Sequence, residues 1–66
     1  MDIIEAKIRK VLYRMIEDKA HDYPKKVFQN ALNQVIEAQL EKERIDEDGV
    51  VRLKQFVEML VEEYCP

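Results

Sequence analysis

The sequence predicts a small all-α domain, a three-helix bundle in which the helices run up, down and up. Apolar residues recur at spacings of three and four in three successive segments, which is typical of amphipathic helices. Of the 66 residues, 47% are hydrophobic and 38% charged, but one is glycine and two are proline, so little of the chain suits loops. Strong breakers fall near residues 24 and 49. We therefore expect helices over residues 2–20, 24–44 and 50–64, in one domain 1–66.

The first predicted helix has an apolar face and a capped start. Its apolar side chains align on one side: Ile4, Ile8, Val11, Leu12, Met15 and Ile16. Asp2 can accept a hydrogen bond from a free amide of the first turn, and Glu5, three residues on, completes a pattern like a capping box. Pro24 keeps Tyr23 out of helical dihedral angles, so this helix is expected to end near residue 20.

The second predicted helix has a wide apolar face. The face is formed by Val27, Phe28, Ala31, Leu32, Val35, Ala38 and Gln39, and it is widened by Ile36 and Leu40. One neighbouring helix cannot cover so much surface, so we expect this helix to be central or to meet a second copy of itself. A two-fold dimer would add the apolar burial that a chain of this length lacks. The predicted dimer interface consists of Phe28, Leu32, Val35, Ile36, Gln39 and Leu40.

The third predicted helix follows a turn at residues 46–49 and has a clear apolar face. Its inward positions are Leu53, Phe56, Val57, Leu60, Val61 and Tyr64, and its outward positions are Arg52, Gln55, Glu58, Glu62 and Glu63. The outer surface of this helix is therefore predicted to be acidic, which would favour a basic partner.

The turn before the third helix has a calcium-loop pattern, carried by Asp46, Asp48, Gly49, Val51 and Phe56. These residues resemble the later part of an EF-hand loop running into its exiting helix. Aligned on the glycine, the resemblance implies Asp46 and Asp48 as the third and fifth ligand positions. Arg44 and Gln55 then stand where the motif has its first and twelfth ligands, so tight calcium binding is not expected. The alternative is that both aspartates are turn and capping residues.

Nucleic-acid binding would use a set of basic and amide side chains: Lys7, Lys10, Arg14, Asn30, Asn33 and Gln34. The cations form a stripe on the first helix that could meet phosphate or an acidic partner, or could be a solvated face. The amides of the second helix are of the types that hydrogen-bond to base edges. Against this, the net charge is −3, and Glu37 and Glu41 share the face of the amides. Nucleic acid is therefore disfavoured.

Reactive side chains are scarce in this sequence. It contains no Ser or Thr, His21 is its one histidine and Cys65 its one cysteine. A hydroxyl nucleophile and a pair of imidazole metal ligands are thus excluded, and one glycine cannot form a phosphate-binding loop. We expect no enzymatic activity, no cofactor and no metal. No apolar run approaches the ~18 residues of a membrane span, and no signal peptide is recognisable, so a cytoplasmic protein is expected.

Taken together, these features predict a small non-enzymatic helical module for protein-protein interaction or regulation. Its expected partners are a second copy of itself and another, unidentified protein. Two alternatives stay open at this point. One is a small DNA-associated regulator of phage, plasmid or bacterial type, and the other is a degenerate EF-hand-like domain.

Overall fold

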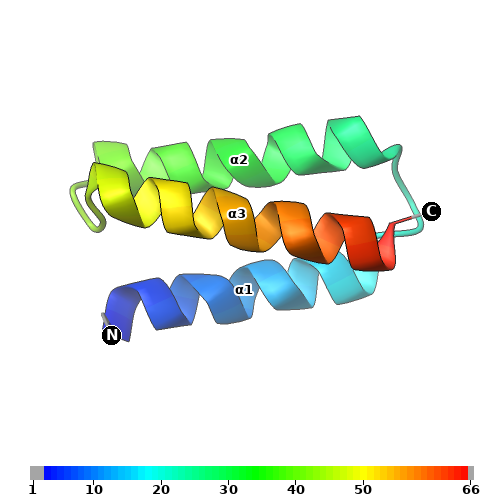
Figure 1. Ribbon diagram of the computed structural model, residues 1–66, viewed down its shortest axis with the longest axis horizontal. Coiled ribbons are helices and arrows are strands. Elements are labelled where there is room, and N and C mark those ends of the chain that lie inside the picture. Colours follow the sequence, from blue (N-terminus) through cyan, green and yellow to red (C-terminus); the bar gives the residue numbers. More distant parts are fainter. Residues whose placement is uncertain (1–2, 66) are drawn as a thin grey trace.

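The computed structural model describes residues 3–65, which form three α-helices and no strand. α1 spans Ile3–Lys19, α2 spans Lys25–Glu41 and α3 spans Glu47–Tyr64. The helices run up, down and up (Figure 1). The predicted all-α three-helix bundle is therefore confirmed, while the cap expected at Asp2 lies outside the described residues. None of the helices within residues 3–65 is both long and apolar enough to cross a lipid bilayer.

The loop between α1 and α2 lies close to its predicted position. α1 ends at Lys19 and α2 begins at Lys25. Pro24 stands at the cap position of α2, with φ of −58° and ψ of 142°, and is not the first helical residue. Its ring still helps to set the direction of α2, because it fixes φ near the value at which the chain enters a helix.

The loop between α2 and α3 begins earlier than predicted. α2 ends at Glu41, three residues before the expected end, because Glu43 adopts a left-handed conformation with φ of 58°. The amides of Glu43 and Arg44 donate to the carbonyls of Leu40 and Gln39, respectively. This is the Schellman arrangement that commonly closes a helix C-terminus.

α3 also begins earlier than predicted, at Glu47. The carboxylate of Asp46 accepts a hydrogen bond of 2.7 Å from the amide of Gly49 and so caps the helix. Glu47 and Asp48 add negative charge to the first turn, where the helix dipole favours it. The stretch predicted as a turn is thus mostly the first turn of a helix, and Gly49 is one of its helical residues.

The hydrophobic core lies between all three helices. Its fully buried large side chains are Leu12 and Ile16 of α1, Leu32 and Ile36 of α2, and Leu53, Val57 and Val61 of α3. Within each helix these residues are four or eight apart, so each set lies on one side of its helix. Burial of each side chain stabilises the fold by roughly 1.5–3 kcal/mol relative to full exposure.

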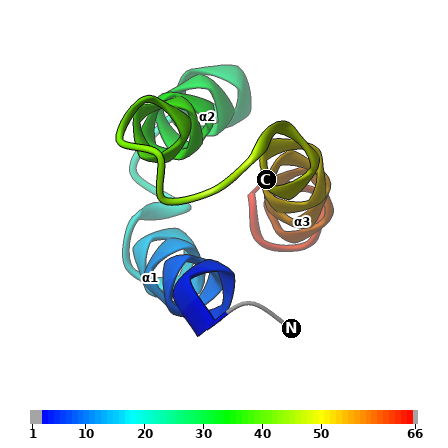
Figure 2. The ribbon, with the colours of Figure 1, turned by 90° about the vertical axis from the view of Figure 1, so that its left-hand side faces the viewer.

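α3 is the central helix of the bundle. It packs against both α1 and α2, whereas α1 and α2 make few contacts with each other. In the end-on view, α3 lies to one side and faces both of the other helices (Figure 2). Of the two roles that the sequence left open for the second helix, the central one is therefore wrong.

Candidate functional site

A shallow groove runs between α1 and α2. Its volume is about 370 Å³, and most of its lining is apolar. α1 contributes Ile4, Ile8 and Val11, and α2 contributes Val35 together with Gln39. The groove forms because α1 and α2 both pack on α3 but hardly on each other. It therefore lies along the side of the bundle that α3 does not cover.

The groove keeps apolar side chains in contact with solvent. Val11 is 54% exposed and Ile4 is 43% exposed, while Ile8 and Val35 are half-buried. Val27 of α2 is 56% exposed but does not line the groove. Single exposed apolar side chains are ordinary, but a continuous strip on a small chain marks an interaction surface.

The six residues predicted as a dimer interface do not share one exposed surface. Three of them are buried in the core of the single chain: Phe28, Leu32 and Ile36. Leu40 lines a second pocket, beside the α2–α3 loop. Val35 and Gln39 line the groove and remain accessible. The wide face of the second helix is thus divided between the core, the loop and the groove.

The basic stripe of α1 meets the groove only at Lys7. Lys7, Lys10 and Arg14 are all exposed, and Lys7 is part of the groove lining. Lys10 and Arg14 line a different pocket, together with Tyr13 of α1 and Phe56 of α3. Within residues 3–65, none of the three cations lies within 4 Å of a carboxylate oxygen. The predicted stripe is therefore exposed, but the structure does not gather it at the groove.

The amide residues predicted to contact bases differ in exposure. Asn30 and Gln34 are exposed on α2, but Asn33 is half-buried. The Oδ1 of Asn33 is enclosed and has no hydrogen-bond partner among the described residues. The cations of this predicted set lie on α1 and its amides lie on α2, and one of the amides is only partly accessible.

An ion pair that the sequence did not reveal joins the starts of α1 and α3. The guanidinium of Arg52 donates two hydrogen bonds to the buried carboxylate of Glu5, through Nε at 2.8 Å and Nη2 at 3.0 Å. These hydrogen bonds lower the pKa of Glu5, and the nearby charges of Arg52 and Arg9 add to the effect. Arg9 lies 3.6 Å from the same carboxylate, one helical turn along α1. These three side chains stabilise this end of the bundle. Both oxygens of Glu5 already accept hydrogen bonds from Arg52.

The aspartates of the calcium-like pattern belong to the start of α3. Under the EF-hand alignment the loop would extend from Arg44 to Gln55, yet the chain is helical from Glu47 onward. Asp46 accepts the hydrogen bond from Gly49 described above, so one of its oxygens is already used. Within residues 3–65, no three His, Cys, Asp or Glu side chains are grouped so that they could hold a metal ion. The residues act here as helix-starting residues.

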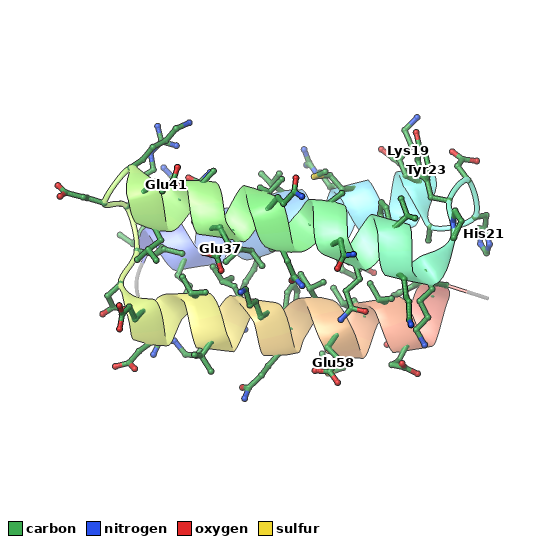
Figure 3. All side chains as sticks on the ribbon, turned by 90° about the horizontal axis from the view of Figure 1, so that it is seen from above. Lys19, His21, Tyr23, Glu37, Glu41 and Glu58 are labelled. Atoms are coloured by element: carbon green, nitrogen blue, oxygen red, sulfur yellow. The ribbon has the colours of Figure 1, made fainter. Side chains whose placement is uncertain are left out.

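The remaining reactive side chains lie apart from the groove. His21 is exposed in the loop at one end of the bundle, near Lys19 and Tyr23 (Figure 3). Cys65 is buried. Tyr13 and Tyr64 share a hydrogen bond of 3.1 Å between their hydroxyls, and this bond raises the pKa of Tyr64 to about 12. The phenol of Tyr64 therefore stays protonated near neutral pH.

Comparison with known proteins identifies no relative: no protein-family model, curated protein or solved structure matches this chain.

Proposed function

We propose that this chain is a small non-enzymatic protein-interaction module, and that it binds a helix of a partner protein in the groove between α1 and α2. The observation that carries the proposal is the arrangement of the three helices. Because α1 and α2 meet mainly through α3, their apolar sides next to the groove stay uncovered. A further helix laid along the groove would cover them.

The shape of the surface fits a helix better than other ligands. Two antiparallel helices form parallel ridges, and amphipathic helices bind such grooves through apolar side chains spaced at i, i+3, i+4 and i+7. Ile4, Ile8 and Val11 follow this spacing on α1. An amphipathic helix could place its own apolar side chains between them and Val35.

A second copy of the chain is the competing occupant. The homodimer expected from the sequence would use Phe28, Leu32 and Ile36, but these side chains already stabilise the single chain. Exposing them would cost more than a new interface on Val35 and Gln39 could return. We therefore propose a partner helix, and self-association is one of the outcomes that the experiment separates.

The proposal is tested by selecting binders from a displayed library of 20-residue amphipathic helices, with apolar positions at helical spacing and all other positions randomised. Val11→Lys places a charge in the groove and should abolish enrichment. Val51→Lys is the matched control, because Val51 of α3 is also 54% exposed and does not line the groove. It should enrich the same peptides as the unmodified chain.

Two results would overturn the proposal. One is an absence of enriched peptides with the unmodified chain. The other is equal enrichment with both variants, which would place binding outside the groove. Sedimentation of the same three proteins separates the second copy: a dimer that Val11→Lys dissociates and Val51→Lys keeps would mean that the chain itself fills the groove.

A further inference from the structure

We infer that the pocket between α1 and α3 binds a nucleoside monophosphate, with the phosphate against Lys10 and Arg14 and the base against the ring of Tyr13. This pocket is separate from the docking groove, because the two share no lining residue. The inference goes beyond the proposed function and does not depend on the partner helix.

The α1–α3 pocket lies where α1 packs alongside α3 (Figure 1). Its volume is about 400 Å³, which is within the range of pockets that hold small ligands. Its lining combines cations, aromatic rings and one carboxylate: Arg9, Lys10, Tyr13, Arg14, Glu17 and Phe56. A ligand with a flat apolar part and a negative charge would match this lining.

The positive charge of the pocket comes mainly from Lys10 and Arg14. Both are exposed, and within residues 3–65 neither lies within 4 Å of a carboxylate oxygen. Lys26 and Lys42 also have no ion pair there, so the lack of a partner does not distinguish the pocket. The distinguishing feature is that two such cations border one pocket next to an aromatic ring.

Arg9 adds a third cation, held over the ring of Phe56 with its Cζ 5.2 Å from the ring centroid. Arg9 shares the carboxylate of Glu5 with Arg52, whose hydrogen bonds already use both oxygens. The charge of Arg9 is therefore not cancelled by a carboxylate of its own. Its Nε is enclosed and has no acceptor among the described residues, so turning the guanidinium toward a ligand would break no hydrogen bond at Nε.

The balance of charge in the lining suits one phosphate monoester. Three cations and the carboxylate of Glu17 leave an excess of two positive charges. A phosphate monoester carries a charge of about −1.5 to −2 at pH 7. Guanidinium groups also match the geometry of phosphate oxygens, with two parallel hydrogen bonds from one side chain.

The ring of Tyr13 provides the flat surface of the pocket. Tyr13 is 37% exposed, so part of the ring is open to solvent. Its other contacts fix the ring: it stands at 89° to the ring of Tyr64, and the two hydroxyls share the hydrogen bond of 3.1 Å. Bases stack on aromatic side chains, and a ring that is already fixed loses little conformational freedom when a base binds.

The carboxylates near Tyr64 favour a single nucleotide over a strand. Glu17 lines the pocket, and the charges of Glu17 and Glu63 both contribute to the raised pKa of Tyr64, which places them near its phenol. A strand would bring further phosphates toward these carboxylates, whereas a mononucleotide brings one. Glu17 can also accept a hydrogen bond from a ribose hydroxyl, a donor that a phosphotyrosine side chain lacks.

The inference is tested by titrating adenosine monophosphate into the isotope-labelled chain and following the NMR signals of the pocket residues. The signals of Tyr13 and Phe56 should shift and saturate. Adenosine and inorganic phosphate each carry only part of the ligand, so each should bind about tenfold more weakly than the nucleotide.

Two variants separate the phosphate contacts from the ring contact. Lys10→Gln/Arg14→Gln should weaken the nucleotide about tenfold, as expected for two exposed charged contacts. Its matched control is Lys26→Gln/Lys42→Gln, which removes the same charge at exposed positions outside the pocket and should bind as the unmodified chain does.

Tyr13→Leu should weaken the nucleotide about tenfold and leave the binding of inorganic phosphate unchanged. Tyr23→Leu is its control, because Tyr23 is 50% exposed and does not line the pocket. Thermal unfolding followed by circular dichroism checks that all four variants are folded.

Several results would overturn the inference. One is the absence of saturable shifts with adenosine monophosphate, and another is equal weakening by a variant and its control. Equal affinity for inorganic phosphate would show that the ring contributes nothing. Tighter binding of phosphotyrosine, or of a short single-stranded oligonucleotide, would show that the pocket serves a different ligand.

Discussion

Arg52 donates two hydrogen bonds to the carboxylate of Glu5, a residue that is almost completely buried at 4% exposure. The two hydrogen bonds join residues that are 47 positions apart in the sequence. One partner sits in the first turn of α1 and the other near the start of α3, so the pair ties these two helix starts together. A single ion pair with this geometry can make the stability of the bundle depend on pH.

Glu5→Gln should therefore change the acid limb of the stability curve. The pKa of Glu5 is lowered in the folded chain, whereas in the unfolded chain it is near its ordinary value of 4.5. The unfolded chain thus binds the proton first as the pH falls. The stabilisation is fully present above about pH 4.5 and is lost as the pH passes through the lowered value.

Urea unfolding of the unmodified chain and of Glu5→Gln, at pH 7 and at pH 3, measures this contribution. We expect a difference of about 1 kcal/mol at pH 7, less than for a fully buried pair because solvent reaches Arg52, and a smaller difference at pH 3. Glu58→Gln is the control, since Glu58 is exposed and forms no ion pair within residues 3–65. A difference for Glu5→Gln that is independent of pH would contradict this role.

At the scale of elements, the α2–α3 connection depends on an unfavourable backbone conformation. Glu43 has a positive φ, which costs a residue with a side chain roughly 1–2 kcal/mol. Glu43→Gly should remove this cost, partly offset by the greater entropy of glycine in the unfolded chain, and should stabilise the protein by about 0.5–1 kcal/mol.

Urea unfolding measures the stability of Glu43→Gly, and Glu41→Gly provides the comparison. Glu41 is the last residue of α2 and is also exposed, but its backbone is helical, so glycine should destabilise the protein there. If Glu43→Gly proved no more stable than the unmodified chain, the left-handed closure of α2 would be contradicted.

The helix boundaries show what local sequence signals can and cannot predict. The first loop was placed nearly correctly because Pro24 acts locally, on its own φ and on the residue before it. The second loop was placed too late because Gly49 was interpreted as the breaker. The chain instead breaks at Glu43, a residue type with no preference for the left-handed region, and Asp46 caps the next helix. Nothing in the local composition marked Glu43.

For the whole molecule, periodicity predicted the fold class but not the order of packing. The spacing of Leu12, Leu32 and Leu53 on their helices predicted that each would face inward, and all three are fully buried. Periodicity identifies the buried side of a helix, but it does not say which neighbour covers that side. Hence the second helix was interpreted as self-associating, although α3 is the helix that covers most of its face.

The candidate site was only partly accessible to sequence reasoning for the same reason. The basic stripe was identified, because its three cations lie on one helix and their spacing is local. The groove beside it was not, because it needs α1 and α2 to be side by side and poorly packed against each other. Val11 was assigned to the core side of α1, and it lines the groove instead.

The proposed docking surface requires the groove to be open in the isolated chain, and methyl NMR with a soluble paramagnetic agent measures this directly. Val11 of the groove should be broadened about as strongly as Val51 of α3, because both side chains are 54% exposed. The methyl groups of Leu12 and Leu32, which are fully buried, should be protected. Protection of Val11 together with the leucines would mean that α1 and α2 close on each other or that a second copy covers the groove, and it would contradict the proposed open groove.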